Sequence, residues 1–400
     1  PDRAGLSACV QCGLCLPVCP TFRLTGRETA SPRGRLQAMV AVADGHADVD
    51  TKFDEILGLC LGCRACEPVC PGMVPYGHLL EGARAEIAEQ LPSYGRRLRR
   101  WVLGRVVPSR SMLRLGTLAV RVIRALHATR LVPARFRRSL SGIRELGDGL
   151  RVSRGEGMPG TGAIGLLVGC VQDEWFPSVN VAARALLVAA GFEVVVPADQ
   201  TCCGALAAHD GHASVADRLG EVNDRAFDGC DRVVATAAGC SAHLRDRLGP
   251  SRGVDITTVI AEAIEQGRLP SLDRGSVDVI VQDPCHLRHA QRSIDAPRAI
   301  LRAGGYRLVE LDDDGMCCGA AGLYTVLQPE ASEKLGRQKA DRIRSKGPEL
   351  VASANPGCEM QLRAFLGGAH RVAHPIELYL EALEAAGFTT NVPALEAADE

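Results

Sequence analysis

The hydrophobic and polar positions in the second half of the chain follow one order twice. A short apolar run, typical of a buried strand, precedes a helix-like stretch, a second apolar run and, further on, a third. In the first copy these segments are "AIGLLVGC" (163–170), "VNVAARALLVAAG" (179–191), "FEVVVPAD" (192–199) and "RVVATAAGC" (232–240). In the second copy they are "VDVIVQDPC" (277–285), "RSIDAPRAILRAGG" (292–305), "YRLVELDD" (306–313) and "ELVASANPGC" (349–358). Strand, helix and strand in this order predict two tandem parallel α/β units, over residues 161–270 and 271–390, with a tail at 391–400.

The first part of the chain has helical spacing. Apolar positions recur at helical intervals over residues 32–44 and 51–59, and the preceding residues Ser31 and Asp50 are good N-caps. Pro32 supports the first of these starts, because proline is favoured at the first helical position. These patterns predict a helical domain over residues 1–90.

Residues 91–160 form a basic helical linker segment. From Leu91 to Arg144 the sequence has 14 Arg and no Lys, Asp or Glu, although the net charge of the whole chain is −1. Residues 110–127 are helix-like, and four arginines fall within about 80° of one another around that helix, with apolar residues on the remainder. The four are Arg110, Arg114, Arg121 and Arg124. Such a stripe suits an anionic membrane surface or an acidic protein partner, and a linker helix packed on its own protein is the alternative.

A glycine-rich stretch, "GEGMPGTGAIG" (155–165), has the G-x-G-x-x-G spacing of dinucleotide-binding loops. Its glycines precede the strand, whereas the dinucleotide fingerprint follows a strand and opens a helix. We therefore expect a flexible linker here, and no flavin or nicotinamide site in this chain.

Composition narrows the class of protein. Hydrophobic residues make up 46 % of the 400 residues and charged residues 23 %, which is ordinary for a globular protein with a sizeable core. We see no secretory signal and no apolar run long enough to span a bilayer, and the net charge gives no argument for nucleic acid. Seventeen cysteines in such a chain indicate a reducing compartment, and metal binding rather than disulfides.

Eight of these cysteines lie in two copies of C-x2-C-x2-C-x3-C-P, "CVQCGLCLPVCP" and "CLGCRACEPVCP", with an offset of 51. This is the ferredoxin pattern for a [4Fe–4S] cluster, in which the fourth cysteine of each run ligates the other cluster. The predicted ligands of cluster 1 are Cys9, Cys12, Cys15 and Cys70, and those of cluster 2 are Cys60, Cys63, Cys66 and Cys19. Zinc is the disfavoured alternative. A zinc ion needs four ligands, which each run could supply alone, so zinc would not explain two matched runs that exchange their fourth cysteine.

A second repeat of cysteines runs through the α/β units. Cys170, Cys202, Cys203 and Cys240 return as Cys285, Cys317, Cys318 and Cys358, and each adjacent pair is followed by glycine. We expect these eight to be ligands at the carboxyl ends of strands, where open α/β sheets place their sites. The glycine is expected to remove a Cβ that would crowd the metal group. Cys230 has no counterpart in the other unit and is interpreted as structural.

With both repeats in view, the chain resembles the iron–sulfur subunit of glycolate oxidase over about residues 5–390. The matching strings are "CVQCGLCLPVCPTF", "SPRGR", "GCVQ", "CCGAL", "AGC", "DPCHLRHAQ" and "MCCGAAGLYTVLQPE". The α/β units also resemble the CCG domains of heterodisulfide reductase. The predicted fold class is thus α+β multidomain, with a helical two-cluster ferredoxin domain, a basic helical linker and two tandem α/β CCG domains.

The resemblance implies an electron-transfer subunit of an oxidoreductase complex, without a substrate site of its own. Glycolate would be oxidised at FAD in partner subunits, and electrons would pass through 4Fe-4S clusters towards membrane quinone. We accordingly expect a cytoplasmic protein peripherally associated with the inner face of the cell membrane.

The CCG motifs depart from the heterodisulfide reductase pattern, because each ends with one cysteine where that family has C-x2-C. The third position after Cys240 is His243, and the third after Cys358 is Gln361. The second CCG site therefore offers four thiolates for a cluster. The first offers either a cluster or, with His243, a Cys3His zinc site. His286 and His289 could tune a nearby site, but ordinary hydrogen-bonded histidines are the favoured interpretation.

Two other functions stay open at this point. The chain could be the cluster subunit of anaerobic glycerol-3-phosphate or D-lactate dehydrogenase, which differs from the leading hypothesis only in its partners. It could also be a heterodisulfide-reductase-like enzyme that acts at a CCG cluster, although the missing fifth cysteines argue against this. A purely structural zinc protein is the remaining alternative.

Overall fold

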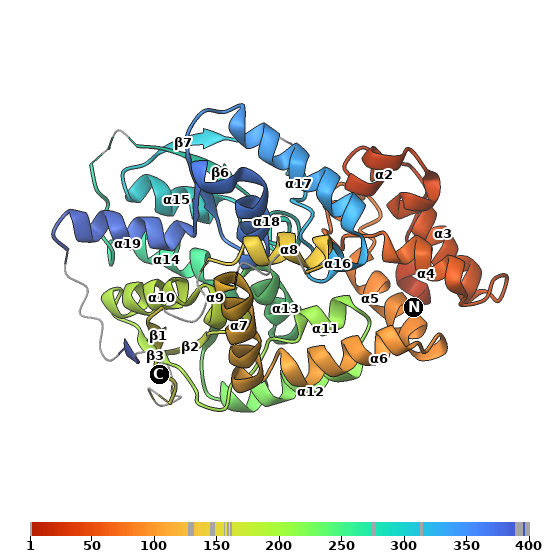
Figure 1. The fold of residues 1–400 in the computed structure, drawn as a ribbon, viewed down its shortest axis with the longest axis horizontal. Helices are drawn as coiled ribbons and strands as arrows, with labels where there is room; N and C mark the ends of the chain where they lie inside the picture. The colour runs from red at the N-terminus through yellow and green to blue at the C-terminus, as the bar shows by residue number, and fades with distance from the viewer. Residues whose placement is uncertain are drawn as a thin grey trace.

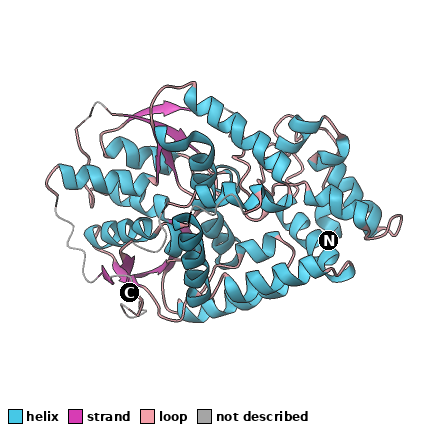
Figure 2. Ribbon diagram, viewed as in Figure 1, coloured by secondary structure: helices cyan, strands magenta, loops and turns pink. Residues whose placement is uncertain are grey.

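The computed structural model describes residues 2–126, 132–144, 149–155, 157, 160, 162–273, 275, 277–312, 315–388 and 395–396. The helical N-terminal domain lies at one end of the molecule, and the two α/β units lie beside each other at the other end (Figure 1). Helices surround the few strands (Figure 2). The α+β multidomain prediction is confirmed.

Two predicted N-caps begin helices in the N-terminal domain. Ser31 Oγ accepts a hydrogen bond from the Gly34 amide at 2.9 Å, and Asp50 Oδ1 accepts one from the Phe53 amide at 2.8 Å. The elements are α1 Arg3–Ser7, α2 Pro20–Thr25, η1 Glu28–Ala30, α3 Pro32–Ala43, α4 Thr51–Gly58 and α5 Tyr76–Gln90. The two cysteine runs occupy the loops between α1 and α2 and between α4 and α5, so one helical core carries both.

The first α/β unit is a four-stranded parallel sheet in the order β3-β2-β4-β5. Its strands are β2 Ala163–Leu167, β3 Glu193–Val195, β4 Arg232–Ala235 and β5 Gly253–Asp255. Its helices are α9 Val171–Trp175, α10 Pro177–Ala189, α11 Ala205–His209, α12 Ala213–Ala226, α13 Ala238–Leu248 and α14 Ile256–Glu265. The predicted strand–helix–strand order is present, and β5 is a strand that the apolar pattern did not reveal.

The second α/β unit repeats this topology, in the order β7-β6-β8-β9. Its strands are β6 Asp278–Gln282, β7 Arg307–Glu310, β8 Leu350–Ser353 and β9 Arg371–Ala373. Its helices are the π-helix η4 His286–Ala290, α15 Asp295–Ala303, α16 Tyr324–Leu327, α17 Pro329–Arg344, α18 Pro356–Leu366, the short η5 Gly367–Ala369 and α19 Pro375–Ala385. The two strands predicted to end at Cys240 and Cys358 end earlier than predicted. Both cysteines lie in the first turn of the following helix, α13 or α18.

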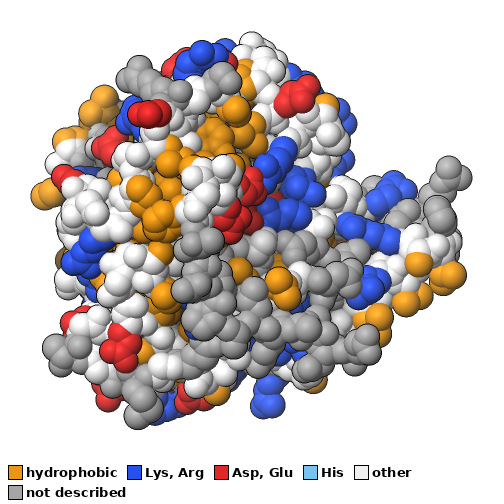
Figure 3. Space-filling view, turned by 90° about the vertical axis from the view of Figure 1, so that its left-hand side faces the viewer, with side chains coloured by type: hydrophobic (Ala, Val, Ile, Leu, Met, Phe, Trp, Pro, Cys, Tyr) orange, Lys and Arg blue, Asp and Glu red, His pale blue; other side chains and the backbone are white. Residues whose placement is uncertain are grey.

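The two α/β units share a hydrophobic core, so they pack as one body. Helices α14 and α10 of the first unit contact α15 and α19 of the second. The shared core includes Ile164, Leu186, Val259, Ile300 and Tyr379, each at most 2 % exposed. On the face of this body turned to the left in Figure 1, hydrophobic side chains gather near adjoining basic and acidic groups (Figure 3).

The basic segment packs on its own protein and contacts all three units. It contains α6 Tyr94–Trp101, the π-helix η2 Val102–Val106, α7 Arg110–Ala125 and α8 Ala134–Ser141. Its ion pairs are Arg96–Asp54, Arg99–Asp210, Arg110–Asp173, Arg138–Glu333 and Arg144–Glu377. The acidic partners belong to the helical domain and to both α/β units, so ion pairs of this segment connect it to all three units.

The predicted orientation of the arginine stripe is wrong for two of its four members. Arg110 pairs with the buried Asp173, and Arg124 donates to the carbonyl oxygen of Leu140, so both face the protein. The apolar side chains of α7 are the ones left exposed. Helical spacing showed correctly which residues share a face. It could not show that Asp173, 63 positions further along the chain, pairs with Arg110 and turns that face towards the protein.

The remaining segments contribute little to the site. β1 Arg151–Val152 pairs antiparallel with β10 Leu395–Glu396. The predicted glycine linker and the predicted tail lie partly outside the described residues. Among the helices that the structure describes, none combines the length and the apolar character that a bilayer crossing requires.

Candidate iron–sulfur sites

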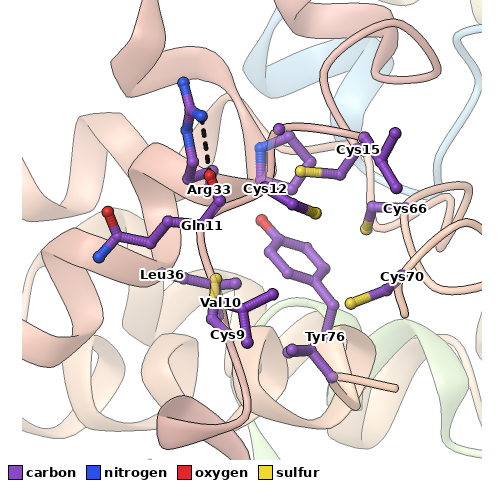
Figure 4. A pocket seen from close by; sticks show the side chains of 14 residues that line it. Cys9, Val10, Gln11, Cys12, Cys15, Arg33, Leu36, Cys66, Cys70 and Tyr76 are labelled. Carbon is purple, nitrogen blue, oxygen red and sulfur yellow. Dashed lines mark hydrogen bonds between the residues drawn. The ribbon is translucent and has the colours of Figure 1, made fainter. Parts of the chain in front are cut away.

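One pocket of the helical domain is lined by five thiols from both cysteine runs (Figure 4). They are Cys9, Cys12, Cys15 and Cys70 of the predicted cluster 1 and Cys66 of the predicted cluster 2, and Tyr76 lines the same pocket. Burial and the neighbouring thiols Cys9 and Cys19 raise the pKa of Cys15. The fourth cysteine of the second run, Cys70, thus lies with the first three of the other run, which is the arrangement that a crossed ligand set requires.

The two loops repeat one backbone conformation. Residues 11 and 13 of the first loop are Gln11 (φ 57°) and Gly13 (φ 83°), and the residues 51 positions later are Gly62 (φ 63°) and Arg64 (φ 59°). The amide of the fourth cysteine also donates to an equivalent carbonyl in each loop, at 3.1 Å. Left-handed residues turn the short loop sharply and aim its amides inward, as a polyanionic cluster requires.

The second group of thiols in this domain is more buried. Cys66 is 8 % exposed and Cys19 is 6 % exposed. Burial, together with Cys63, Cys60 and Cys19, holds the pKa of Cys66 well above its ordinary value, so these four thiols act on one another electrostatically.

A buried cation lies beside this second group. Arg35 is fully buried on α3 and donates to the carbonyl of Ile56 and to the hydroxyl of Thr21. Although burial opposes it, Arg35 and Arg84 lower the pKa of Cys60. A fixed positive charge here favours thiolate, which is the form that binds iron. Arg35 belongs to the string "SPRGR", and an arginine next to the apolar stripe of α3 was the signal that could have identified it.

All eight cysteines of the CCG motifs line one cavity of about 530 Å³. The cavity lies between the two α/β units, the helical domain and the basic segment, which contribute, for example, Cys60, Leu103 and Ile143. Three Sγ–Sγ distances are short: 3.3 Å for Cys170–Cys202, 3.1 Å for Cys203–Cys240 and 3.3 Å for Cys318–Cys358. Cys230 is buried in the core of the first unit and is not among the residues that line the cavity.

Each CCG group contains a thiol whose ionised form is stabilised. Hydrogen bonds from Cys170 and Cys203 hold the pKa of Cys202 well below its ordinary value. Those from Cys317 and Cys358 do the same for the pKa of Cys318. Clustered thiols that share negative charge in a largely apolar cavity fit a thiolate-ligated iron–sulfur group.

The glycine of each CCG string has a different role from the expected one. Gly319 has φ 86°, and a Cβ there would lie 2.9 Å from the Ser332 carbonyl oxygen and from Leu335 Cβ on α17. Gly204 is equivalent, with φ 93° and the Ala216 carbonyl oxygen 3.1 Å away. The glycine is therefore needed for the left-handed backbone and for the close approach of a helix, not to leave room on the side of the thiols.

His243 does not line the cavity that the thiols of the first CCG group share. It lines a second, smaller pocket with Glu81, His209 and His286, among others. The described residues contain no group of three or more Cys, His, Asp or Glu side chains arranged to hold a single metal ion. His243 is nevertheless among the groups that lower the pKa of Cys202, so the zinc alternative stays a prediction.

His286 lies beside the second CCG group. Its Nδ1 is 3.6 Å from the sulfur of Cys285, and its ring lies 5.3 Å from the ring of His209. Burial lowers the pKa of His289, whose Nε2 has no hydrogen-bond partner among the described residues. His286 thus interacts directly with a candidate ligand.

The second ferredoxin group packs against the second CCG group. Leu61, Cys317, Tyr324 and Leu335 form one buried cluster, with Cys63 and Cys285 packed against it. Tyr324 donates from its hydroxyl to the carbonyl of Leu59 at 3.0 Å, and so joins the two domains beside these thiols. Besides burial, Cys285 is the largest influence that raises the pKa of Cys63. Sequence spacing gave no sign of this contact, which joins residues more than 200 positions apart.

Comparisons with known proteins agree with this architecture. A family model described as "4Fe-4S dicluster domain" matches residues 5–74, and one described as "Cysteine-rich domain" matches residues 164–245 and 279–363. The "Probable glycolate oxidase iron-sulfur subunit" of Bacillus subtilis (strain 168) is 32 % identical, with 95 % of each chain covered. The "Glycolate oxidase iron-sulfur subunit" of Escherichia coli (strain K12) is 30 % identical, covering 95 % of this chain and 94 % of the relative. One subunit of the fumarate reductase (CoM/CoB) of Methanothermobacter marburgensis is 28 % identical, over 90 % of this chain and 68 % of that protein.

Proposed function

Because this chain belongs to the family of glycolate oxidase iron–sulfur subunits, we propose that it relays electrons from FAD in partner subunits towards membrane quinone. The donor reaction is the oxidation of glycolate or a similar 2-hydroxy acid in those partners. The chain itself supplies ligands and a protected route.

Two crossed clusters form the first part of the route. Cluster 1 is held by Cys9, Cys12, Cys15 and Cys70, and cluster 2 by Cys60, Cys63, Cys66 and Cys19. The support for cluster 1 is the shared pocket, and for cluster 2 the mutual effect of these thiols on the pKa of Cys66. A bound cluster would supply one-electron transfer, while Arg35 and Arg84 balance part of the thiolate charge.

The observation that carries the proposal is that Cys63 and Cys285 pack against one buried cluster, which contains Cys317, and that Cys285 raises the pKa of Cys63. It supports a position of the proposed cluster 2 next to the proposed second CCG site (Cys285, Cys317, Cys318, Cys358). Electrons pass fastest between neighbouring redox centres, so the proposed order of the route is cluster 1, cluster 2, second CCG site. Cys12 of cluster 1 is exposed, whereas Cys60 and Cys66 of cluster 2 are buried, so cluster 1 is the outer end.

The first CCG site (Cys170, Cys202, Cys203, Cys240) lines the same cavity as the second, and the proposal assigns the third cluster to the second site. This shared cavity is also the observation that favours a second candidate function, an enzyme acting on a small molecule between two CCG centres. Reduction of such a molecule by the isolated, iron-loaded chain, without flavin subunits, would support that function instead.

The test of the proposed function is purification of the native complex, with analysis of its flavin, iron and zinc. We expect FAD-containing subunits to co-purify with this chain, about twelve iron atoms per chain for three four-iron clusters, and no stoichiometric zinc. A chain that purifies alone with zinc in its cysteine sites would contradict the proposal.

A further inference from the structure

Helix α7 presents an unusually exposed apolar face. Leu115, Leu118, Val122 and Leu126 recur at intervals of three and four residues and therefore lie on one side of the helix. Their exposed fractions are 68 %, 53 %, 49 % and 72 %. Single exposed aliphatic residues are common, but four on one side of one helix indicate a surface that a membrane or another molecule covers in the functional protein.

The opposite side of α7 is the side that packs on the protein. Thr117 is 2 % exposed, and its hydroxyl accepts a hydrogen bond from the indole of Trp175 at 3.1 Å. Arg110 pairs with Asp173 from the same side. These contacts fix the rotation of the helix, so the leucine stripe points outward as a consequence of the fold.

We propose that this stripe docks the protein on an anionic phospholipid bilayer, with α7 lying in the plane of the membrane surface. The inference rests on the proposed function, whose electron acceptor is a membrane quinone, and it assigns the surface that faces the membrane. Aliphatic side chains enter the boundary between headgroups and acyl chains, and nearby cations are attracted to anionic headgroups.

The charge of the segment decides between a bilayer and a protein partner. No acidic residue occurs from Leu91 to Arg144, and the described exposed charges there are arginines, namely Arg97, Arg100, Arg105, Arg121 and Arg137. Two aromatic residues of the neighbouring helix α6, Tyr94 and Trp101, are 83 % and 52 % exposed. Leucine, arginine and exposed aromatic residues without acid are the combination found at membrane interfaces.

The test is sedimentation of the iron-loaded full chain with lipid vesicles. We expect binding to vesicles that contain phosphatidylglycerol and much weaker binding to vesicles of phosphatidylcholine alone. The triple variant Leu115→Gln, Leu118→Gln, Val122→Gln should bind the anionic vesicles roughly tenfold less, or weaker still. Val277→Gln, which alters a 52 % exposed side chain before β6, is the matched control and should bind as the wild type does.

Three outcomes would overturn the inference. They are equal binding of the triple variant and the wild type, equal binding to neutral and anionic vesicles, and a wild-type oligomer that the triple substitution converts to monomer without lipid. Iron content and reduction of the chain by flavin subunits, measured on the same samples, report on the proposed function separately. Loss of vesicle binding with both retained would leave the relay proposal intact.

Discussion

At the scale of single residues, the cysteines could be predicted from spacing, while the groups that surround them could not. The offset of 51 revealed the two ferredoxin runs, and the offset of 115 revealed the CCG pairs. Arg35 and Tyr324 escaped because each acts through a contact with a distant segment: Arg35 with Ile56, and Tyr324 with Leu59. A regular spacing reveals ligands that one loop delivers together, but not a side chain that comes from another element, such as Arg35, or from another domain, such as Tyr324.

Gly319 offers a test of the CCG loop. In Gly319→Ala, a left-handed backbone and a Cβ 2.9 Å from a carbonyl oxygen should cost about 2–4 kcal/mol of stability and release iron from the second CCG site. Gly347→Ala is the matched control, because Gly347 has φ 96° and open space around it, and should cost only about 1 kcal/mol. Denaturant unfolding and iron content measure both effects, and equal losses in the two variants would refute the role given to the α17 contact.

Cys318 and Cys203 separate the two CCG sites. Cys318→Ser should remove about four of roughly twelve iron atoms, because Cys318 belongs to the four-thiolate set of the second site. Cys203 belongs to the first site, so Cys203→Ser should leave those four in place. Iron analysis of each purified variant decides, and a wild-type chain with only eight iron atoms, none of them in the CCG units, would rule out this assignment.

At the scale of helices and strands, periodicity predicted the order of elements and left their surroundings open. The first three strands of each sheet were predicted, but β5 and β9 were missed. The equally short β3 belongs to the apolar run over residues 194–196, whereas β5 and β9 lie among polar residues and glycines without such a run. For α7 the grouping of residues was correct and the exposed face was not. A 3.6-residue period defines two faces, and only the tertiary partners decide which one is covered.

The contact of α5 with α11 should give the domain interface a dependence on acid. Glu81 on α5 is 2.7 Å from His209 Nδ1. Although burial opposes it, the hydrogen bond and charge of His209 lower the pKa of Glu81 to about 2, below its ordinary value near 4.5. A carboxyl whose pKa is lower in the folded protein stabilises the fold above its unfolded pKa, and this contribution is lost as the pH falls from about 4.5 towards 2.

Glu81→Gln should therefore reduce stability by about 1–3 kcal/mol at pH 7 and have little effect near pH 2–3. Glu89→Gln, on the exposed end of the same helix, is the control and should change stability by less than about 0.5 kcal/mol. Thermal unfolding across this pH range provides the comparison, and a Glu81→Gln deficit that persists unchanged at low pH would exclude the ionised pair as its cause.

At the scale of the whole molecule, the proposed order of the redox sites depends on how the domains of the chain pack on one another. The basic segment, the shared core of the α/β units and the Tyr324 contact together place the buried ferredoxin group on the second CCG group. Neither repeat predicts this alone, because each describes a domain and not its neighbours. The family resemblance implied electron transfer, and the packing adds which cysteine groups are neighbours: the more buried ferredoxin group and the second CCG group pack against one buried cluster.

The most direct test of the relay is transient reduction of the native complex containing Cys66→Ser in place of the wild-type chain, with Cys15→Ser measured in parallel. After glycolate is added, flavin reduction and quinone reduction are followed separately. The account predicts that flavin is reduced at the wild-type rate, because that chemistry lies in the partner subunits, while quinone reduction is abolished in an assembled complex that lacks one ferredoxin-type cluster. Loss of flavin reduction in an assembled complex, or quinone reduction at the wild-type rate, would contradict it.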